Sequence, residues 1–130
     1  LEVGTGSGYQ TAVLLELGAR VYTIERQRQL FLDAQKTLGP LNYKPVFFYG
    51  DGYEGLPSYQ PFDRILVTAA APEIPQDLLN QLAIGGILVV PEGDSRGQKM
   101  IRVVREAEDK FQRSEHGHFS FVPLLRGKNQ

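Results

Sequence analysis

The sequence predicts an α/β protein whose sheet is mostly parallel and ends in an antiparallel hairpin. Short apolar runs alternate with helical patterns along most of the 130 residues, and this alternation is typical of a parallel sheet covered by helices on both faces. The runs "RILVTAA" and "GGILVV" are continuously apolar, as expected for strands buried on both sides. Near the end of the chain, apolar and polar residues alternate instead, which favours antiparallel strands. The length fits one domain over residues 1–130.

Five strands are expected before the hairpin. They are short segments rich in apolar, β-branched and aromatic residues, bracketed by Gly and Pro. The predicted strands cover residues 1–3, 19–25, 46–51, 62–72 and 87–93.

Three helices are expected between these strands, over 9–18, 26–40 and 74–86. The first has Ala12, Val13 and Leu17 near one face and is followed by a stop at Gly18. The second stops at a Gly-Pro pair and the third at a Gly-Gly pair.

The hairpin is expected from two alternating segments, "KMIRVVRE" at 99–106 and "HFSFVPLL" at 118–125. The polar stretch 107–114 between them predicts the connection.

Composition excludes several classes of function. The chain has no cysteine, which excludes disulfide scaffolds, thiolate catalysis and iron–sulfur clusters and fits a reducing, cytoplasmic location. The net charge is −1, whereas nucleic-acid binding favours a basic surface. No apolar run approaches the roughly 20 residues that span a bilayer. His116 and His118 lack further ligands at a zinc-binding spacing. We therefore expect no metal, no nucleic acid and no membrane.

The opening "LEVGTGSGYQ" places Gly4, Gly6 and Gly8 between a strand and a helix. Glycine there permits positive φ and close approach of a ligand to the main chain, and the following helix offers unpaired N–H groups. A dinucleotide fingerprint requires G-x-G-x-x-G, but Tyr9 occupies the third position, which disfavours a nicotinamide enzyme. The pattern instead matches the E/D-x-G-x-G-x-G signature of S-adenosylmethionine methyltransferases, with Glu2 as its acid.

Two further acids follow predicted strands. Glu25 ends the second strand, where a carboxylate accepts hydrogen bonds from ribose hydroxyls. Asp51 lies beside Gly52 after the third strand, where it can accept a hydrogen bond from an adenine amino group. In open parallel sheets ligands bind beyond the carboxyl ends of the strands, so these acids and the loop 68–72 mark the expected site.

The sequence closely resembles the protein-L-isoaspartate O-methyltransferases. The resemblance is carried, in order along nearly the whole chain, by "EVGTGSGYQ", "VYTIER", "GDGYEGLP", "FDRILVTAAAPEIP", "LLNQLAIGGILVVPEG" and "FVPL". The segments "TAAAPEIP" and "FVPL" are far more specific than the glycine turn. The resemblance implies a Rossmann-like class I S-adenosylmethionine-dependent methyltransferase fold.

The resemblance also implies a reaction. Members of this family transfer the methyl group of S-adenosylmethionine to the α-carboxylate of isoaspartyl residues in damaged proteins and peptides. The ester then collapses to a succinimide, which can hydrolyse to normal aspartate. The partners expected are isoaspartyl proteins and peptides, and the full-length protein is expected to be a monomer.

Carried over by position, the resemblance assigns site residues. The catalytic set, which faces the transferred methyl group or pairs with the substrate main chain, is Thr68, Ala69 and Val122. The cofactor-binding set is Glu2, Gly4, Thr5, Gly6, Ser7, Gly8, Glu25, Arg26, Asp51 and Gly52. Phe119 and Phe121 are expected in the core rather than in contact with substrate.

One departure from the family pattern bears on activity. The family has a segment before the glycine motif, with a Thr/Ser-Ile-Ser-Ala-Pro-His-like loop that helps to grip the isoaspartyl carboxylate. Here Leu1 lies inside the first strand, so we expect an N-terminally truncated chain. The alternatives are a cofactor-binding fragment without activity, or a methyltransferase of the same fold that acts on RNA or a small molecule.

Overall fold

The computed structural model describes residues 1–130 and contains one seven-stranded sheet with strand order β3-β2-β1-β4-β5-β6-β7. The first five strands in this order are parallel, and β6 and β7 are antiparallel to their neighbours. The strands are β1 Glu2–Val3, β2 Tyr22–Glu25, β3 Val46–Tyr49, β4 Phe62–Val67, β5 Leu82–Asp94, β6 Gly97–Ala107 and β7 Lys110–Phe119. The predicted α/β class, with its mostly parallel sheet and terminal hairpin, is confirmed.

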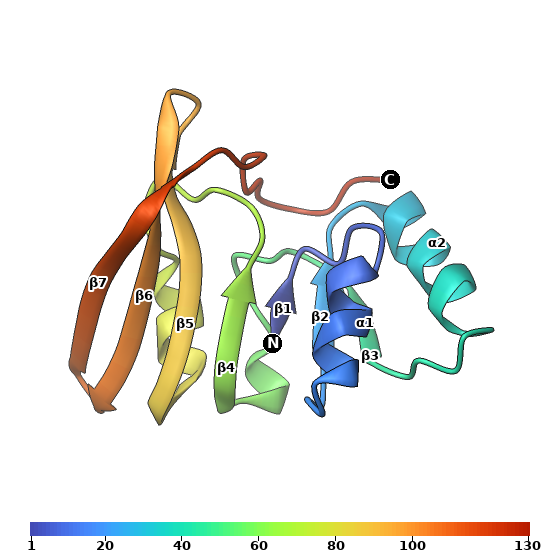
Figure 1. Ribbon diagram of the computed structural model, residues 1–130, viewed down its shortest axis with the longest axis horizontal. Coiled ribbons are helices and arrows are strands. Elements are labelled where there is room, and N and C mark those ends of the chain that lie inside the picture. Colours follow the sequence, from blue (N-terminus) through green and yellow to red (C-terminus); the bar gives the residue numbers. More distant parts are fainter.

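Three α-helices and one 3₁₀ turn connect the parallel strands. They are α1 Tyr9–Glu16, α2 Arg28–Leu38, the 3₁₀ turn Pro57–Tyr59 and α3 Gln76–Gln81. Helices α1 and α3 lie on opposite faces of the sheet (Figure 1). None of these helices is long and apolar enough to cross a membrane, and no cluster of three or more potential metal-ligating side chains occurs.

The core lies between the central strands and α3. Leu88 and Val90 of β5, Ile65 of β4 and Leu78 of α3 are essentially inaccessible to solvent. Burying each such side chain contributes about 1.5–3 kcal/mol relative to leaving it exposed. The sequence predicted burial on both faces of these strands, but Leu66 and Val89 on the opposite face are only half-buried.

The buried residue of the first helix does not lie on the face that the sequence predicted to be buried. Thr11 is the buried residue of α1, whereas Val13 is 39% and Leu17 is 79% exposed. The stop at Gly18 agrees with the structure, because this glycine follows the C-cap with φ of 92°. Thr11 is buried because its hydroxyl bonds to Glu2 beneath the helix.

The predicted helix over 74–86 is wrong in its second half. Helix α3 ends at Gln81, and Leu82 is already extended and pairs with Phe62 of β4. The pairing then shifts register before Arg64 meets Ile87, and Gly85 has φ of 85° in this irregular stretch. The Gly-Gly pair therefore lies within β5, where strand pairing prevails over helical spacing.

The predicted hairpin is shifted along the sequence. Strand β6 pairs with residues 110–119, so most of the polar stretch 107–114 is strand and the turn lies at 108–109. β7 tolerates polar residues because it is an edge strand that is largely exposed. After Phe119 the chain leaves the sheet and crosses the carboxyl ends of the parallel strands toward α2 (Figure 1).

We predict that Leu88→Ala lowers the free energy of unfolding by about 2–5 kcal/mol, because it leaves a cavity in the core. Ile84→Ala on the same strand is the matched control, since Ile84 is 65% exposed, and it should change stability by less than about 0.5 kcal/mol. Urea denaturation measures both values. Equal losses for the two variants would contradict this placement of the core.

Candidate active site

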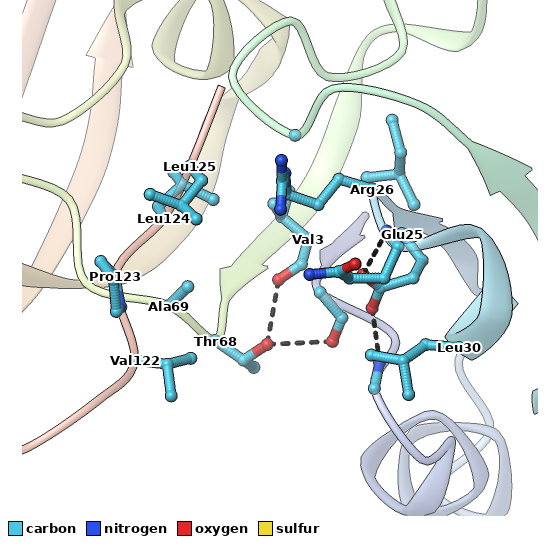
Figure 2. A pocket seen from close by; sticks show the side chains of 15 residues that line it. Val3, Glu25, Arg26, Leu30, Thr68, Ala69, Val122, Pro123, Leu124 and Leu125 are labelled. Atoms are coloured by element: carbon cyan, nitrogen blue, oxygen red, sulfur yellow. Dashed lines mark hydrogen bonds between the residues drawn. The ribbon is translucent and has the colours of Figure 1, made fainter. Parts of the chain in front are cut away.

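A cavity of about 370 Å³ opens at the carboxyl ends of β1, β2 and β4 (Figure 2). Its volume falls within the range of roughly 300–1,000 Å³ typical of small-molecule sites. The walls come from the end of β1 and its turn, the β2–α2 connection, the end of β4 and residues 122–125. This is the edge of a parallel sheet where ligands are expected to bind.

A second, larger cavity of about 710 Å³ lies elsewhere, against the face of the sheet. Apolar side chains such as Leu14, Leu66 and Val89 line it, and the glycine turn and Glu25 do not. Size alone therefore does not identify the site. The smaller cavity combines a strand edge, a glycine turn and a buried carboxylate, and it is the candidate site.

The glycine turn after β1 brings bare backbone to the cavity. Gly4, Gly6 and Gly8 have φ values of 100°, 55° and 88°, which side chains rarely adopt. A Cβ on Gly4 would lie 2.5 Å from Thr68 Oγ1, whereas a Cβ on Gly6 would meet no atom within 4 Å. Gly4 therefore allows β1 and β4 to pack closely, and Gly6 presents its main chain to open space.

The amides of these glycines hold the turn itself together. Gly4 N donates to Ile24 O at 2.9 Å, Gly6 N to Glu25 Oε1 at 2.9 Å and Gly8 N to Thr5 O at 3.0 Å. These three N–H groups are not free for a ligand. Their contribution is shape and rigidity, so the loop reaches the cavity in one fixed conformation.

Glu2 lies beneath the turn rather than on the cavity wall. Only 1% of it is exposed, and its carboxylate accepts hydrogen bonds from Gln10 Nε2 at 2.9 Å, Thr11 Oγ1 at 2.5 Å and Thr23 Oγ1 at 2.7 Å. The Thr5 hydroxyl shares a 2.6 Å hydrogen bond with that of Thr23. This network joins β1, α1 and β2, and it supports the turn from below.

Glu25 reaches the cavity from the end of β2. It is 6% exposed, and its two oxygens accept from Gly6 N at 2.9 Å and Gln27 N at 3.0 Å (Figure 2). A carboxylate has about four lone-pair sites, so these two bonds orient Glu25 without exhausting it. It can still accept hydrogen bonds from the hydroxyl groups of a ligand.

Thr68 joins the ends of β1 and β4. Its hydroxyl lies 3.0 Å from both Val3 O and Gly4 O, to which it donates (Figure 2). The side chain therefore braces the glycine turn while also lining the cavity.

Residues 120–129, which we call the strap, cross the site, and residues 122–125 form the opposite wall of the cavity. Ala70 N donates to Val122 O at 2.7 Å, and Leu124 N donates to Ala70 O at 2.7 Å. Val122 is 70% exposed, while Leu124 is buried against the core. The amide of Val122 makes no backbone hydrogen bond, so it is left to pair with another chain.

Most of the residues expected in the site converge on this cavity. Those that line it are Gly4, Gly6, Glu25, Arg26, Gly52, Thr68, Ala69 and Val122. Those that do not are Glu2, Thr5, Ser7, Gly8 and Asp51. Asp51 is half-buried, and its carboxylate accepts a hydrogen bond from Tyr53 N at 2.9 Å.

The sequence predicted Phe119 and Phe121 in the core, and this is wrong: Phe119 is exposed and Phe121 is half-buried.

Several residues of the cavity wall were not indicated by the sequence. The additional wall residues are Val3, Ile24, Gln27, Leu30, Pro123, Leu124 and Leu125. The position of Leu30 in the first turn of a helix that follows a site-bearing strand could have indicated its role. No local signal shows that the strap turns back over the cavity.

The order of the strands and helices is that of the class I S-adenosylmethionine methyltransferase fold. A protein from Plasmodium falciparum, solved in complex with S-adenosyl-L-homocysteine, shares the fold with a TM-score of 0.77 and 23% identity, over 95% of this chain and 64% of that one. A solved protein-L-isoaspartate O-methyltransferase gives a TM-score of 0.84 and 29% identity, over 94% of this chain and 40% of that one.

The chain belongs to the protein-L-isoaspartate(D-aspartate) O-methyltransferase family, whose model matches residues 1–129. It is 55% identical, over 130 residues, to the protein-L-isoaspartate O-methyltransferase of Christiangramia forsetii. The match covers 99% of this chain and 61% of that relative. The chain thus spans about three fifths of the length of the curated relatives it matches.

We predict that Glu2→Gln lowers the free energy of unfolding by about 2–3 kcal/mol, because a charged acceptor of three hydrogen bonds becomes an amide that faces the donor of Gln10. Glu16→Gln is the control, since Glu16 is exposed and accepts only from Tyr43. The free energy of unfolding of that variant should stay within about 0.5 kcal/mol of the value for the parent. Denaturant unfolding followed by circular dichroism measures both, and an unaffected Glu2→Gln would rule out the supporting network.

Proposed function

We propose that the protein transfers a methyl group from S-adenosylmethionine to the α-carboxylate of L-isoaspartyl residues in damaged proteins and peptides. The observation that carries the proposal is the match of the family model to residues 1–129, on a chain whose glycine turn and Glu25 border one cavity. The name shared by the relatives at 55% identity supports the same reaction.

The residues around the cavity suit S-adenosylmethionine. Gly6 leaves open space beside its main chain, and Glu25 offers carboxylate oxygens on the same wall. Apolar side chains such as Ile24, Leu30 and Leu124 provide surfaces for an adenine ring. Gly4 and Gly6 would border the methionine part and Glu25 the ribose, with Gly52 and Arg26 beside the adenosine. When bound, this cofactor supplies a methyl group activated by a positively charged sulfur.

The acceptor requires little proton chemistry from the protein. A carboxylate with a pKa near 4 is already ionised at pH 7, so no general base is needed. No histidine lines the cavity, in agreement with this requirement. The protein's task is then to align the acceptor oxygen and to exclude water.

The acceptor side of the cavity is formed by Thr68, Ala69 and Val122. In our proposal Thr68 braces this wall through Val3 and Gly4, and the amide of Val122 pairs with the main chain of the substrate as an added strand would. The curated relatives are longer than this chain, which spans about three fifths of their length. In the relatives, residues outside this match can complete the acceptor side of the site.

The proposal also concerns partners and location. Its partners are isoaspartyl proteins and peptides, and it includes neither nucleic acid nor membranes. With 14 basic and 15 acidic residues, the chain has no excess of positive charge to neutralise phosphates. We propose a cytoplasmic monomer.

We predict methyl transfer from radiolabelled S-adenosylmethionine to a peptide with one isoaspartyl residue, and none above background to its aspartyl twin. The product of the complete reading frame and the 130-residue chain should be assayed side by side. Equal labelling of the two peptides would remove the repair assignment. Binding of S-adenosyl-L-homocysteine without any transfer by either protein would instead indicate a cofactor-binding protein without activity.

We also predict that Gly6→Ala weakens the binding of S-adenosyl-L-homocysteine at least about tenfold, because the new methyl group would occupy the cavity. Gly18→Ala is the matched control, since Gly18 also has positive φ and open surroundings but lies away from the site. Both variants should lose about 1 kcal/mol of stability from backbone strain. Isothermal calorimetry separates them, and unchanged affinity of Gly6→Ala would contradict this placement of the cofactor.

A further inference from the structure

The strap is attached at two ends that lie at different parts of the cavity. One end is next to β6, where Gln98 Oε1 accepts a hydrogen bond from Phe121 N at 2.6 Å. The other end is next to the β2–α2 connection, where Asn129 N donates to Arg26 O at 2.7 Å. Between them, residues 122–125 line the cavity.

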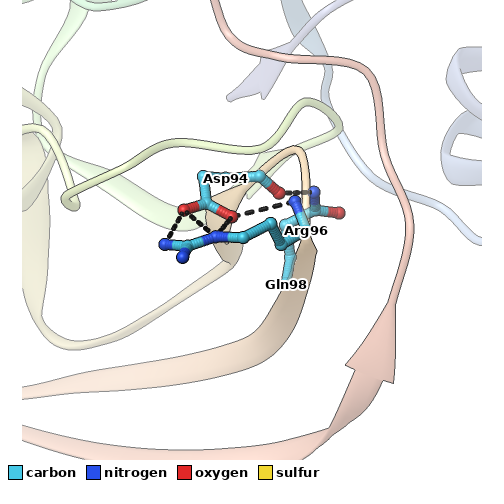
Figure 3. Close-up of polar contacts among 3 residues, drawn as sticks. All are labelled: Asp94, Arg96 and Gln98. Atoms are coloured by element: carbon cyan, nitrogen blue, oxygen red, sulfur yellow. Dashed lines mark hydrogen bonds and ion pairs between the residues drawn. The ribbon is translucent and has the colours of Figure 1, made fainter.

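Gln98 is suited to fix the first end. It is 4% exposed, and its amide is used at both atoms, because Nε2 also donates to Asp94 O at 2.5 Å (Figure 3). The side chain therefore cannot swing away without leaving a polar group unpaired, which is costly when buried. Phe121, two residues after the end of β7, is held where the chain turns toward the cavity.

The turn at 95–96, which precedes Gln98, has polar contacts of its own. Asp94 accepts from Arg96 N at 2.9 Å, and the guanidinium of Arg96 lies 2.7 Å from Asp94 Oδ2 (Figure 3). The Arg96 side chain and backbone hydrogen bonds lower the pKa of the Asp94 carboxyl. The bond from Arg96 N closes the turn beside Asp94, and the Asp94 carbonyl accepts the bond that orients Gln98.

The second end is held by a different set of contacts around Asn129. Its carbonyl accepts from Arg28 N at 2.9 Å and from the Tyr49 hydroxyl at 3.2 Å, and its side-chain amide donates to Gln27 Oε1 at 2.5 Å. Just before it, Gly127 O accepts from Arg26 Nε at 3.1 Å. Apart from the contact with Tyr49, these contacts fall on Arg26, Gln27 and Arg28, which directly follow Glu25.

The two ends border different groups of the site. Val122 lies beside Thr68 and Ala69 (Figure 2). The connection that Asn129 holds begins at Arg26, directly after Glu25. We propose that Gln98 and Asn129 are positioning residues with separate roles: Gln98 sets the acceptor end of the cavity, and Asn129 sets the cofactor end. This inference rests on the proposed methyl transfer to isoaspartyl peptides.

The acceptor end is tested by Gln98→Met in the product of the complete reading frame. Removal of the acceptor of Phe121 N should raise the KM for an isoaspartyl peptide about fivefold to tenfold, with kcat and the Kd for S-adenosyl-L-homocysteine within about twofold. Gln98→Glu keeps an oxygen for Phe121 N but donates to Asp94 O only when its carboxyl is protonated, so it should restore most of the KM at acidic pH. Exchange of the Phe121 amide hydrogen should be faster in Gln98→Met than in the parent.

The cofactor end is tested by Asn129→Pro, which removes the N–H that bonds to Arg26 O. The Kd for S-adenosyl-L-homocysteine should rise about fivefold to tenfold, with the peptide KM at saturating cofactor within about twofold. Gln130→Ala, one residue further on, is the control and should behave as the parent.

The outcomes separate the inference from the proposed function. A rise in the peptide KM alone for Gln98→Met, together with a rise in the cofactor Kd alone for Asn129→Pro, supports the inference. Equal effects on KM and Kd in each variant, or no effect in either variant, overturn it. If Gln98→Met does not fold, a Gln98→Glu variant with parental KM but faster exchange at Phe121 overturns the assignment of Gln98. A parent protein that binds S-adenosyl-L-homocysteine but never labels the isoaspartyl peptide overturns the proposed function, and this inference with it.

Discussion

The buried carboxylate of Glu2 is the interaction on which the site depends most. It is almost inaccessible to solvent and satisfied by three side chains from α1 and β2. A buried carboxylate is tolerated only when its hydrogen bonds are complete, so it constrains how the first strand, the first helix and the second strand meet. The glycine turn lies directly above this junction, and its conformation follows from it.

The rest of the cavity is built on that junction from residues far apart in sequence. Gly6 and Glu25 bond to each other across two strand ends, and Thr68 ties the turn to β4. The strap closes the opposite side through its pairing with Ala70. Hydrogen bonds thus hold the glycine turn on one side of the cavity and the strap on the other. This arrangement suits the proposed reaction, whose main requirement is the alignment of two reactants.

The sequence was most informative where the signal is local. The alternation of apolar strands with helices, and the glycines that follow "LEV", depend on neighbouring residues, and the observed sheet and turn agree with them. The family resemblance placed Val122 in the site, and Val122 lines the cavity. The path of the strap could not be predicted, because "FVPL" alternates as a strand does, and distant contacts with Ala70 and Gln98 hold it over the site. Leu82 likewise has helical spacing but pairs with Phe62.

In our proposal, the cavity bordered by the glycine turn, Glu25 and the strap holds the methyl donor. Titration of the ¹⁵N-labelled chain with S-adenosyl-L-homocysteine, followed residue by residue by NMR, tests it most directly. We expect the largest chemical-shift changes on the amides of Gly6, Glu25 and Leu124. Shifts confined to the second cavity, around Leu66 and Val89, would contradict it.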